Sequence, residues 1–121
     1  MKKRCPCCSR EYYGREIYCT RCGVPLERKK VYIAGRITGD PDYRQKFEAA
    51  ANRLTDTGHI PLNPANLPEG LSRADYMRIC TAMLETADEV LFLPDWQDSR
   101  GASLEMQWCL YIGKPFRCGK W

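Results

Sequence analysis

The sequence lacks long apolar runs. No stretch of its 121 residues approaches the roughly 20 consecutive apolar residues that a membrane-spanning helix requires. Residues 1–20 contain no apolar run of the length found in a signal peptide. These absences favour a cytoplasmic protein with no membrane partner, and they argue against paired disulfides, which need an oxidising compartment. Histidine is scarce as well: His59 is the only one, and we place it at the start of a strand rather than in a metal site.

Cysteine, by contrast, is abundant near the amino terminus. Two C-x-x-C pairs, ten residues apart, contribute four cysteines: Cys5, Cys8, Cys19 and Cys22. Each pair can form a tight turn that directs two thiolates toward one metal, and two pairs complete the tetrahedral all-cysteine shell typical of structural zinc. Cys7 lies inside the first pair and is left out of this shell. The spacing therefore predicts a zinc ribbon over residues 1–28, with one structural zinc ion and no organic cofactor.

Charge is distributed unevenly along the chain. Residues 1–30 hold nine Lys and Arg against three acids, a formal charge of +6, whereas the remaining 91 residues carry −2. Four thiolates around one Zn²⁺ would leave the ribbon at about +4. A basic surface that also carries Tyr12, Tyr13 and Tyr18 could contact nucleic acid. The alternative is a solvated surface without a partner.

Short apolar runs and amphipathic segments alternate after the ribbon. The apolar runs predict strands at residues 31–35, 59–62, 89–93 and 115–118. Helices are predicted between them, the first from an Asp40–Pro41 N-cap to Gly58, the second from a Ser72–Asp75 capping box, and the third over residues 102–112. This order predicts an α/β domain over residues 30–121, a small parallel sheet with helices on both faces in a three-layer, flavodoxin- or Rossmann-like arrangement.

Three loops follow the carboxyl ends of the predicted strands, where parallel sheets bind their ligands: residues 35–39, 63–70 and 95–101. Gly35 allows close approach to the backbone, and Arg36 can pair with a phosphate through two hydrogen bonds. Ser99 and Gly101 precede a helix whose free N–H groups favour an anion. The loops predict a site for a polar small molecule, including an anionic one. The alternative is that these are ordinary turn and cap residues.

Glu105 is unusual because it shares a helix face with apolar residues, at spacings of three, four and seven. A carboxylate on an apolar stripe should be either paired or functional. Arg36 or Tyr32 would be its partner if it were merely paired. Its helix phase alone does not decide which way it points.

Four segments together are similar to the nucleoside 2-deoxyribosyltransferase-like superfamily: YIAGRITG at 32–39, DYM at 75–77, ADEV at 87–90 and WQDSRGASLE at 96–105. The resemblance is to a branch common in phages and prophages whose function is unassigned, and it covers about residues 30–117. The ribbon lies outside it. The opening strand–glycine motif and the Ser-x-Gly-x-x-x-Glu motif are specific in combination.

The resemblance implies either transfer of a deoxyribosyl group between bases or hydrolysis of the N-glycosidic bond of deoxynucleoside 5'-monophosphates. It implies that Glu105 is the nucleophile and that Tyr32 orients its carboxylate. The residues implied at the nucleotide and its 5' end are Gly35, Arg36, Ile37, Ser99 and Gly101. The carboxylate would attack the anomeric carbon, and water or a second base would resolve the glycosyl-enzyme ester.

One departure from the family concerns the acid that protonates the leaving base. Relatives carry an aspartate where Cys80 stands, and a cysteine replaces a carboxylate poorly in this role. Asp98 or Asp95 could act instead, with Asp95 otherwise placed among the substrate-binding residues. Two other functions therefore stay open, a non-catalytic nucleotide-binding module and a zinc-ribbon adaptor for nucleic acid or protein. A homodimer is expected by analogy alone.

Overall fold

The computed structural model describes residues 2–26 and 28–121. The amino-terminal hairpin segment, residues 2–26, contains the antiparallel pair β1 (Lys3–Arg4) and β2 (Glu11–Tyr12). The rest alternates strands and helices: β3 (Lys30–Ala34), α1 (Tyr43–Asp56), β4 (Ile60–Leu62), α2 (Arg73–Thr86), β5 (Glu89–Phe92), α3 (Arg100–Ile112) and β6 (Phe116–Cys118). Two short 3₁₀ turns, η1 (Pro64–Asn66) and η2 (Trp96–Asp98), follow β4 and β5.

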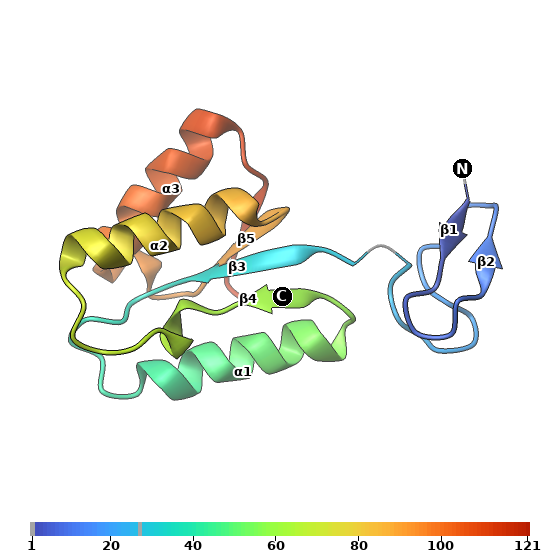
Figure 1. Ribbon diagram of the computed structural model, residues 1–121, viewed down its shortest axis with the longest axis horizontal. Coiled ribbons are helices and arrows are strands. Elements are labelled where there is room, and N and C mark those ends of the chain that lie inside the picture. The colour runs from blue at the N-terminus through green and yellow to red at the C-terminus, as the bar shows by residue number, and fades with distance from the viewer. Residues whose placement is uncertain (1, 27) are drawn as a thin grey trace.

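The four later strands form one parallel sheet in the order β4-β3-β5-β6. Helix α1 covers one face, and α2 and α3 cover the other (Figure 1). Alternate residues of β3 serve the two faces: Val31 and Ile33 pack in the cluster with Phe47 of α1, whereas Tyr32 packs with Leu84 of α2. This burial on both faces explains why the central strands are continuous apolar runs. The predicted three-layer α/β architecture is confirmed.

The helix boundaries agree with the prediction at α2 and differ at two other places. Ser72 and Asp75 form the expected reciprocal capping box. Helix α1 begins at Tyr43 instead of Pro41, because Asp40 accepts a hydrogen bond from the Asp42 N–H and holds a turn before the helix. The predicted loop over residues 95–101 is shorter in the structure. The 3₁₀ turn η2 lies within it, and α3 begins at Arg100, two residues before the predicted start.

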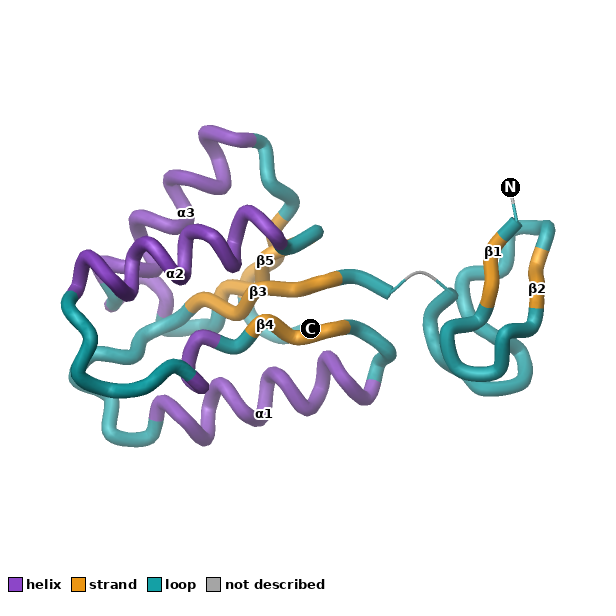
Figure 2. Tube along the Cα trace, in the orientation of Figure 1, coloured by secondary structure: helices purple, strands orange, loops and turns teal. Residues whose placement is uncertain are grey.

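The hairpin segment lies beyond the amino ends of the strands of the parallel sheet. The loops that follow the carboxyl ends of these strands lie at the opposite end of the sheet (Figure 2). The hairpin segment has a small cluster of its own, in which Tyr12 and Leu26 pack with buried cysteines. Within residues 2–26 and 28–121, no helix is both long and apolar enough to cross a membrane.

Candidate functional site

The hairpin segment brings together the predicted metal ligands. The sulfurs of Cys5, Cys8, Cys19 and Cys22 all lie within 4.8 Å of one another, so they could hold one metal ion. Backbone N–H groups of Cys8 and Cys22 donate to the sulfurs of Cys5 and Cys19, at 3.4 and 3.3 Å. The Tyr12 hydroxyl also donates to Cys19, at 3.2 Å. These donors stabilise thiolates and fix their orientation.

The thiols of this cluster influence one another's ionisation. The hydrogen bond from Tyr12 lowers the pKa of Cys19 to about 6. The neighbouring Cys8 sulfur has the opposite effect on Cys22 and raises its pKa. Four sulfurs this close cannot all ionise easily unless a cation neutralises them, and a set of four thiolates suits a soft or borderline metal ion. The donor set therefore fits a bound metal.

A cavity of about 760 Å³ opens at the carboxyl ends of β3 and β5, between α2 and α3. Its walls include most of the side chains expected there from the sequence: Tyr32, Gly35, Arg36, Ile37, Asp98, Ser99, Gly101 and Glu105. Asp95 is the one expected residue that does not line it. We call this space the Glu105 cavity.

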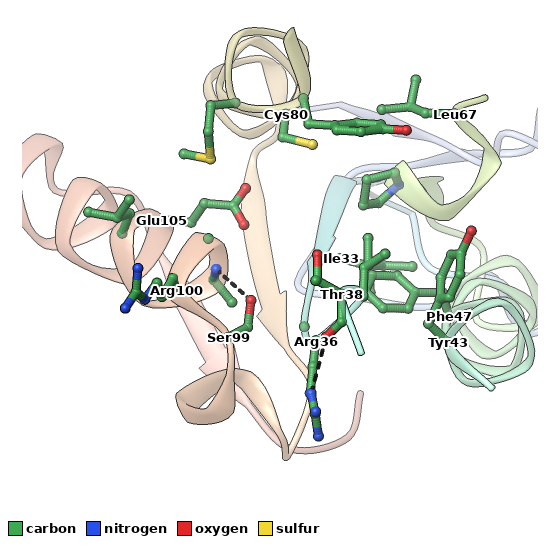
Figure 3. Close-up of a pocket in the computed structure, with 18 of the residues that line it drawn as sticks. Ile33, Arg36, Thr38, Tyr43, Phe47, Leu67, Cys80, Ser99, Arg100 and Glu105 are labelled. Atoms are coloured by element: carbon green, nitrogen blue, oxygen red, sulfur yellow. Dashed lines mark hydrogen bonds between the residues drawn. The ribbon is translucent and has the colours of Figure 1, made fainter. Parts of the chain in front are cut away.

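Glu105 projects from α3 into this cavity, toward the space between Cys80 and Ser99 (Figure 3). The residue is only 7% exposed, and its Oε2 finds no hydrogen-bond partner in the described part of the chain. Burial raises the pKa of Glu105 to about 7, and the nearby Tyr32 hydroxyl offsets part of that rise. A buried carboxylate without a cation is costly to the fold, which points to a role with a ligand.

Tyr32 and Cys80 are titratable neighbours of this carboxylate that line the cavity. Burial raises the pKa of Tyr32 well above its ordinary value, and Glu105 raises it further, so the phenol stays protonated and can act as a donor. Burial also raises the pKa of Cys80, with Tyr32 opposing that shift. The Cys80 thiol is therefore neutral near pH 7. It lines the cavity and also packs against the cluster under α2 and α3.

In the loop after β3, the charged group of Arg36 is hydrogen-bonded to the loop itself. The Arg36 guanidinium donates to the carbonyls of Thr38 and Gly39, at 3.3 and 3.5 Å. Figure 3 shows this side chain directed away from Glu105. At Gly35 a Cβ would meet the Leu93 side chain at 3.0 Å, so a larger residue would require Leu93 to shift.

Asp95 joins this loop to the one after β5. Its carboxylate accepts the Arg36 N–H at 3.2 Å and pairs with Lys46 of α1. Lys46 also pairs with Asp40, at 2.7 Å. The three charged side chains hold two cavity loops together, so Asp95 shapes the cavity from outside instead of facing it.

The start of α3 forms another part of the rim. Ser99 caps the helix, and its Oγ accepts the Ala102 N–H at 3.2 Å. At Gly101 a Cβ would meet the Met77 sulfur and the Ser99 hydroxyl at 3.9 Å, an ordinary van der Waals distance. Asp98, at the end of η2, is exposed at the mouth. Helix N–H groups and a hydroxyl thus border the entrance.

Sequence reasoning missed the aromatic and apolar side of the cavity, contributed by α1, α2 and the loop before α2: Tyr43, Phe47, Leu67, Tyr76 and Met77. It also missed two cations on the walls, Arg73 and Arg100. Tyr43 and Phe47 on α1, and Tyr76 and Cys80 on α2, are each four residues apart in the sequence, the spacing of a helix stripe that faces the core. Residues that line a cavity beside the core share this spacing, so the pattern could not separate the two roles.

The comparisons with known proteins address this geometry. A family model described as "Domain of unknown function (DUF4406)" matches residues 29–117. The chain belongs to the DUF4406 family. This family is nucleoside 2-deoxyribosyltransferase-like, so the resemblance found in the sequence is confirmed, and the phage branch stays a prediction. No curated protein matches the chain.

The fold of this chain is similar to a solved structure, a 2-desoxiribosyltransferase from Leishmania mexicana, with a TM-score of 0.62 and 17% sequence identity. The match covers 74% of this chain and 63% of that one, so the chain spans less than two thirds of that protein. At this identity the likeness shows the fold alone. In this DUF4406 chain, a buried carboxylate stands beside a protonated tyrosine in a cavity with an apolar wall and a polar rim.

Proposed function

We propose that this protein breaks the N-glycosidic bond of a nucleoside or nucleotide through a covalent intermediate on Glu105. The observation that carries the proposal is the buried Glu105 carboxylate, whose Oε2 has no hydrogen-bond partner in the described residues and which faces the 760 Å³ cavity. The family and the fold support it, because both are deoxyribosyltransferase-like.

The chemistry is that of a retaining glycosidase. The ionised carboxylate attacks the anomeric carbon, a C–O ester bond forms, and the bond to the base nitrogen breaks as the base takes up a proton. Water then attacks the same carbon and displaces the carboxylate. Tyr32 orients Glu105 and, by lowering its pKa, keeps more of it ionised.

The substrate we favour is a deoxynucleoside 5'-monophosphate, with water as the acceptor. The base would lie against the apolar side of the cavity, and the sugar over Glu105. Ser99, Gly101 and the start of α3 would meet the phosphate. Arg36 was expected to bind it directly, but its guanidinium is engaged by its own loop, so Arg73 and Arg100 on the cavity wall are the better-placed cations.

The acid that protonates the base is assigned to Asp98. Its carboxylate is exposed to solvent at the cavity mouth. Cys80 is a neighbour of Glu105, but its neutral thiol is a weak acid. Asp98→Asn should therefore lower the rate more for bases that leave poorly than for bases that leave well.

Base release tests the proposed function. Metal-loaded protein is incubated with deoxy- and ribonucleotides and their nucleosides, with and without a second base, and the products are separated by chromatography. Free base from the wild type, with none from Glu105→Gln, supports hydrolysis, and a new nucleoside supports transfer. Glu48→Gln, an exposed site on α1, serves as the matched control and should behave as the wild type. Equal release from Glu105→Gln and the wild type would overturn the proposal.

A non-catalytic nucleotide-binding module is the second candidate, and the observation that favours it is Cys80 in place of an acid. Calorimetry with deoxynucleotides separates the two. Binding without base release would support the module, and restored release in Cys80→Asp would show that only the acid is missing. Absence of binding by every nucleotide would remove both candidates.

The metal in the hairpin segment is assigned as one structural zinc ion, held by the four clustered cysteines, and residues 1–28 are proposed as a ribbon separate from the α/β domain. Metal analysis of purified protein should give one zinc per chain, and Cys22→Ser should lower that content, whereas Cys7→Ser should not. Equal loss in both variants would refute this ligand set. The nucleic-acid partner, the homodimer and the cytoplasmic location stay predictions.

A further inference from the structure

A second cavity lies at the opposite end of the sheet from Glu105. It measures about 260 Å³ and lies between the hairpin segment and the amino ends of the parallel strands. The hairpin contributes Lys3 and Tyr18 to its walls, and the α/β part contributes Lys29, His59, Arg117 and Trp121. Figure 2 shows the hairpin on this side of the sheet. We call it the amino-end cavity.

The walls of the amino-end cavity carry more positive than negative charge. Glu89 is the carboxylate that pairs with two of its three cations: Lys29 lies 3.6 Å away, and the Arg117 Nε donates at 3.2 Å. The third cation, Lys3, donates to the backbone carbonyl of Glu16 at 3.3 Å. Within the described residues, one carboxylate thus balances three cations, and a net positive charge remains.

Several N–H donors on these walls are not used by the protein. The Arg117 guanidinium lies over the Trp121 ring, 3.9 Å from its centroid, and only its Nε is hydrogen-bonded in the described part of the chain. His59 accepts the Lys29 backbone N–H on Nδ1, at 3.2 Å, and its edge meets the Trp121 ring. Burial and the charge of Lys29 lower the pKa of His59, which favours the neutral ring. Because Nδ1 accepts a hydrogen bond, the neutral ring carries its proton on Nε2. No acceptor for that N–H occurs among residues 2–26 and 28–121.

We propose that the amino-end cavity binds a phosphate group. Phosphate offers several oxygens to the donors on these walls, which belong to Lys3, Lys29, Arg117 and His59. A guanidinium with free terminal nitrogens matches its geometry. The indole of Trp121 and the exposed ring of Tyr18 give the site flat apolar walls, which suit an ester of phosphate. The inference is independent of the proposed glycosidase, because the two cavities share no lining residue.

Tryptophan indole signals can test this directly. Zinc-loaded, ¹⁵N-labelled full-length protein is titrated with inorganic phosphate at constant ionic strength, and the N–H signals of Trp96, Trp108 and Trp121 are followed by NMR. Of the three, only Trp121 lines the amino-end cavity, so its signal should shift and saturate. The signal of Trp108, which lines neither cavity, should stay fixed. Absence of a Trp121 shift, or an equal shift with chloride, would overturn the proposal.

Two neighbouring lysines provide a matched pair of variants. Lys3→Gln removes a charge from the cavity and should weaken phosphate binding about tenfold, because a charge-assisted contact is lost. Lys2→Gln removes the same charge one residue away, from a side chain that pairs with Glu11, and should change binding by less than about twofold. Arg117→Gln gives a second test if Lys3→Gln disturbs the hairpin. Equal effects of Lys2→Gln and both cavity variants would contradict the site.

The source of the phosphate is resolved by two further titrations. A nucleoside monophosphate and a single-stranded oligonucleotide are added separately, each followed by inorganic phosphate as competitor. A Trp121 shift with the oligonucleotide, reversed by phosphate, would assign the site to a nucleic-acid backbone beside the basic hairpin. A shift with the mononucleotide alone would assign it to a small ligand. If neither ester shifts Trp121, the proposal is wrong for phosphate esters.

Discussion

The two ends of the parallel sheet each hold one buried glutamate, and the two carboxylates differ in their partners. Glu89, at the amino end, is 8% exposed, and its two oxygens pair with Lys29 and Arg117. Glu105, at the carboxyl end, is 7% exposed and leaves Oε2 without a partner in the described residues. Burial is equal, so the missing partner is what distinguishes them.

This difference separates a structural carboxylate from a functional one. A buried charge with cations beside it contributes to the fold or costs it little, whereas an unpaired one lowers stability and persists where a ligand needs it. The raised pKa of Glu105 records that cost. For Glu89 the partners lie at the surface, so the energy of its ion pairs is reduced by solvent.

Exchange of each carboxylate for an amide should show the difference between Glu105 and Glu89 most clearly in the rate of base release. Glu105→Gln keeps the shape of the side chain and removes the nucleophile, so base release should fall at least about 10³-fold. Glu89→Gln, at the opposite end, should change the rate by less than about twofold. Chromatographic assays at saturating substrate measure both. A similar loss in the two variants would mean that the fold, and not the nucleophile, limits activity.

The same two variants should shift stability in opposite directions. Because the pKa of Glu105 is raised to about 7 from 4.5, the folded state binds more protons than the unfolded state between these values, and wild-type stability falls as pH rises through this window. Glu105→Gln removes this loss. Its gain in the free energy of unfolding over the wild type should be about 2 kcal/mol larger at pH 8.5 than at pH 5.5.

Denaturant unfolding of both proteins at the two pH values measures that gain. A difference between wild type and Glu105→Gln that does not depend on pH would show that Glu105 is not buried without a counter-charge. Glu48→Gln again provides the control, since an exposed glutamate should give no pH-dependent difference.

Glu89→Gln should lower the free energy of unfolding by about 1–2 kcal/mol, because Lys29 and Arg117 lose a charged acceptor. Part of this loss should be screened by salt, since both cations are partly exposed. Denaturant unfolding at low and high salt measures it. A stability equal to that of the wild type at low salt would remove the contrast between the two ends of the sheet.

Tyr32→Phe should give the smallest effect, and it tests whether the Tyr32 hydroxyl sets the pKa of Glu105. The phenol lowers the pKa of the carboxyl, so its removal should move the midpoint of the kcat/KM–pH profile above 7. At pH 7 the rate should fall about threefold to tenfold, and it should recover toward pH 9 as Glu105 ionises. A loss that is the same at every pH would assign Tyr32 to another role.

Much of the fold followed from local patterns in the sequence. Buried strands of a parallel sheet are continuous apolar runs, and the capping box at Ser72 and Asp75 acts within one helix turn, so both were predictable. The start of α1 was missed because Asp40 is held by Lys46 and by the backbone of Asp42, and this turn competes with the expected N-cap.

The candidate site was predictable where one residue breaks a pattern. Glu105 stands out because a carboxylate interrupts an apolar helix stripe. The position of Asp95 depends on Lys46, which is 49 residues away in the sequence, so no local pattern contains it. The direction of Arg36 depends on the carbonyls of its own loop. Tyr43 and Tyr76 line the cavity because of how α1 and α2 pack around it, which no local pattern encodes.

Trapping the intermediate tests the central claim most directly. A 2'-fluoro-substituted deoxynucleotide slows departure of the sugar from the carboxylate, so the glycosyl ester should accumulate and be seen by intact-protein mass spectrometry. The account predicts one added sugar phosphate per chain, located by peptide mapping on Glu105 and absent in Glu105→Gln. Base release without any adduct, or an adduct on another residue, would contradict it.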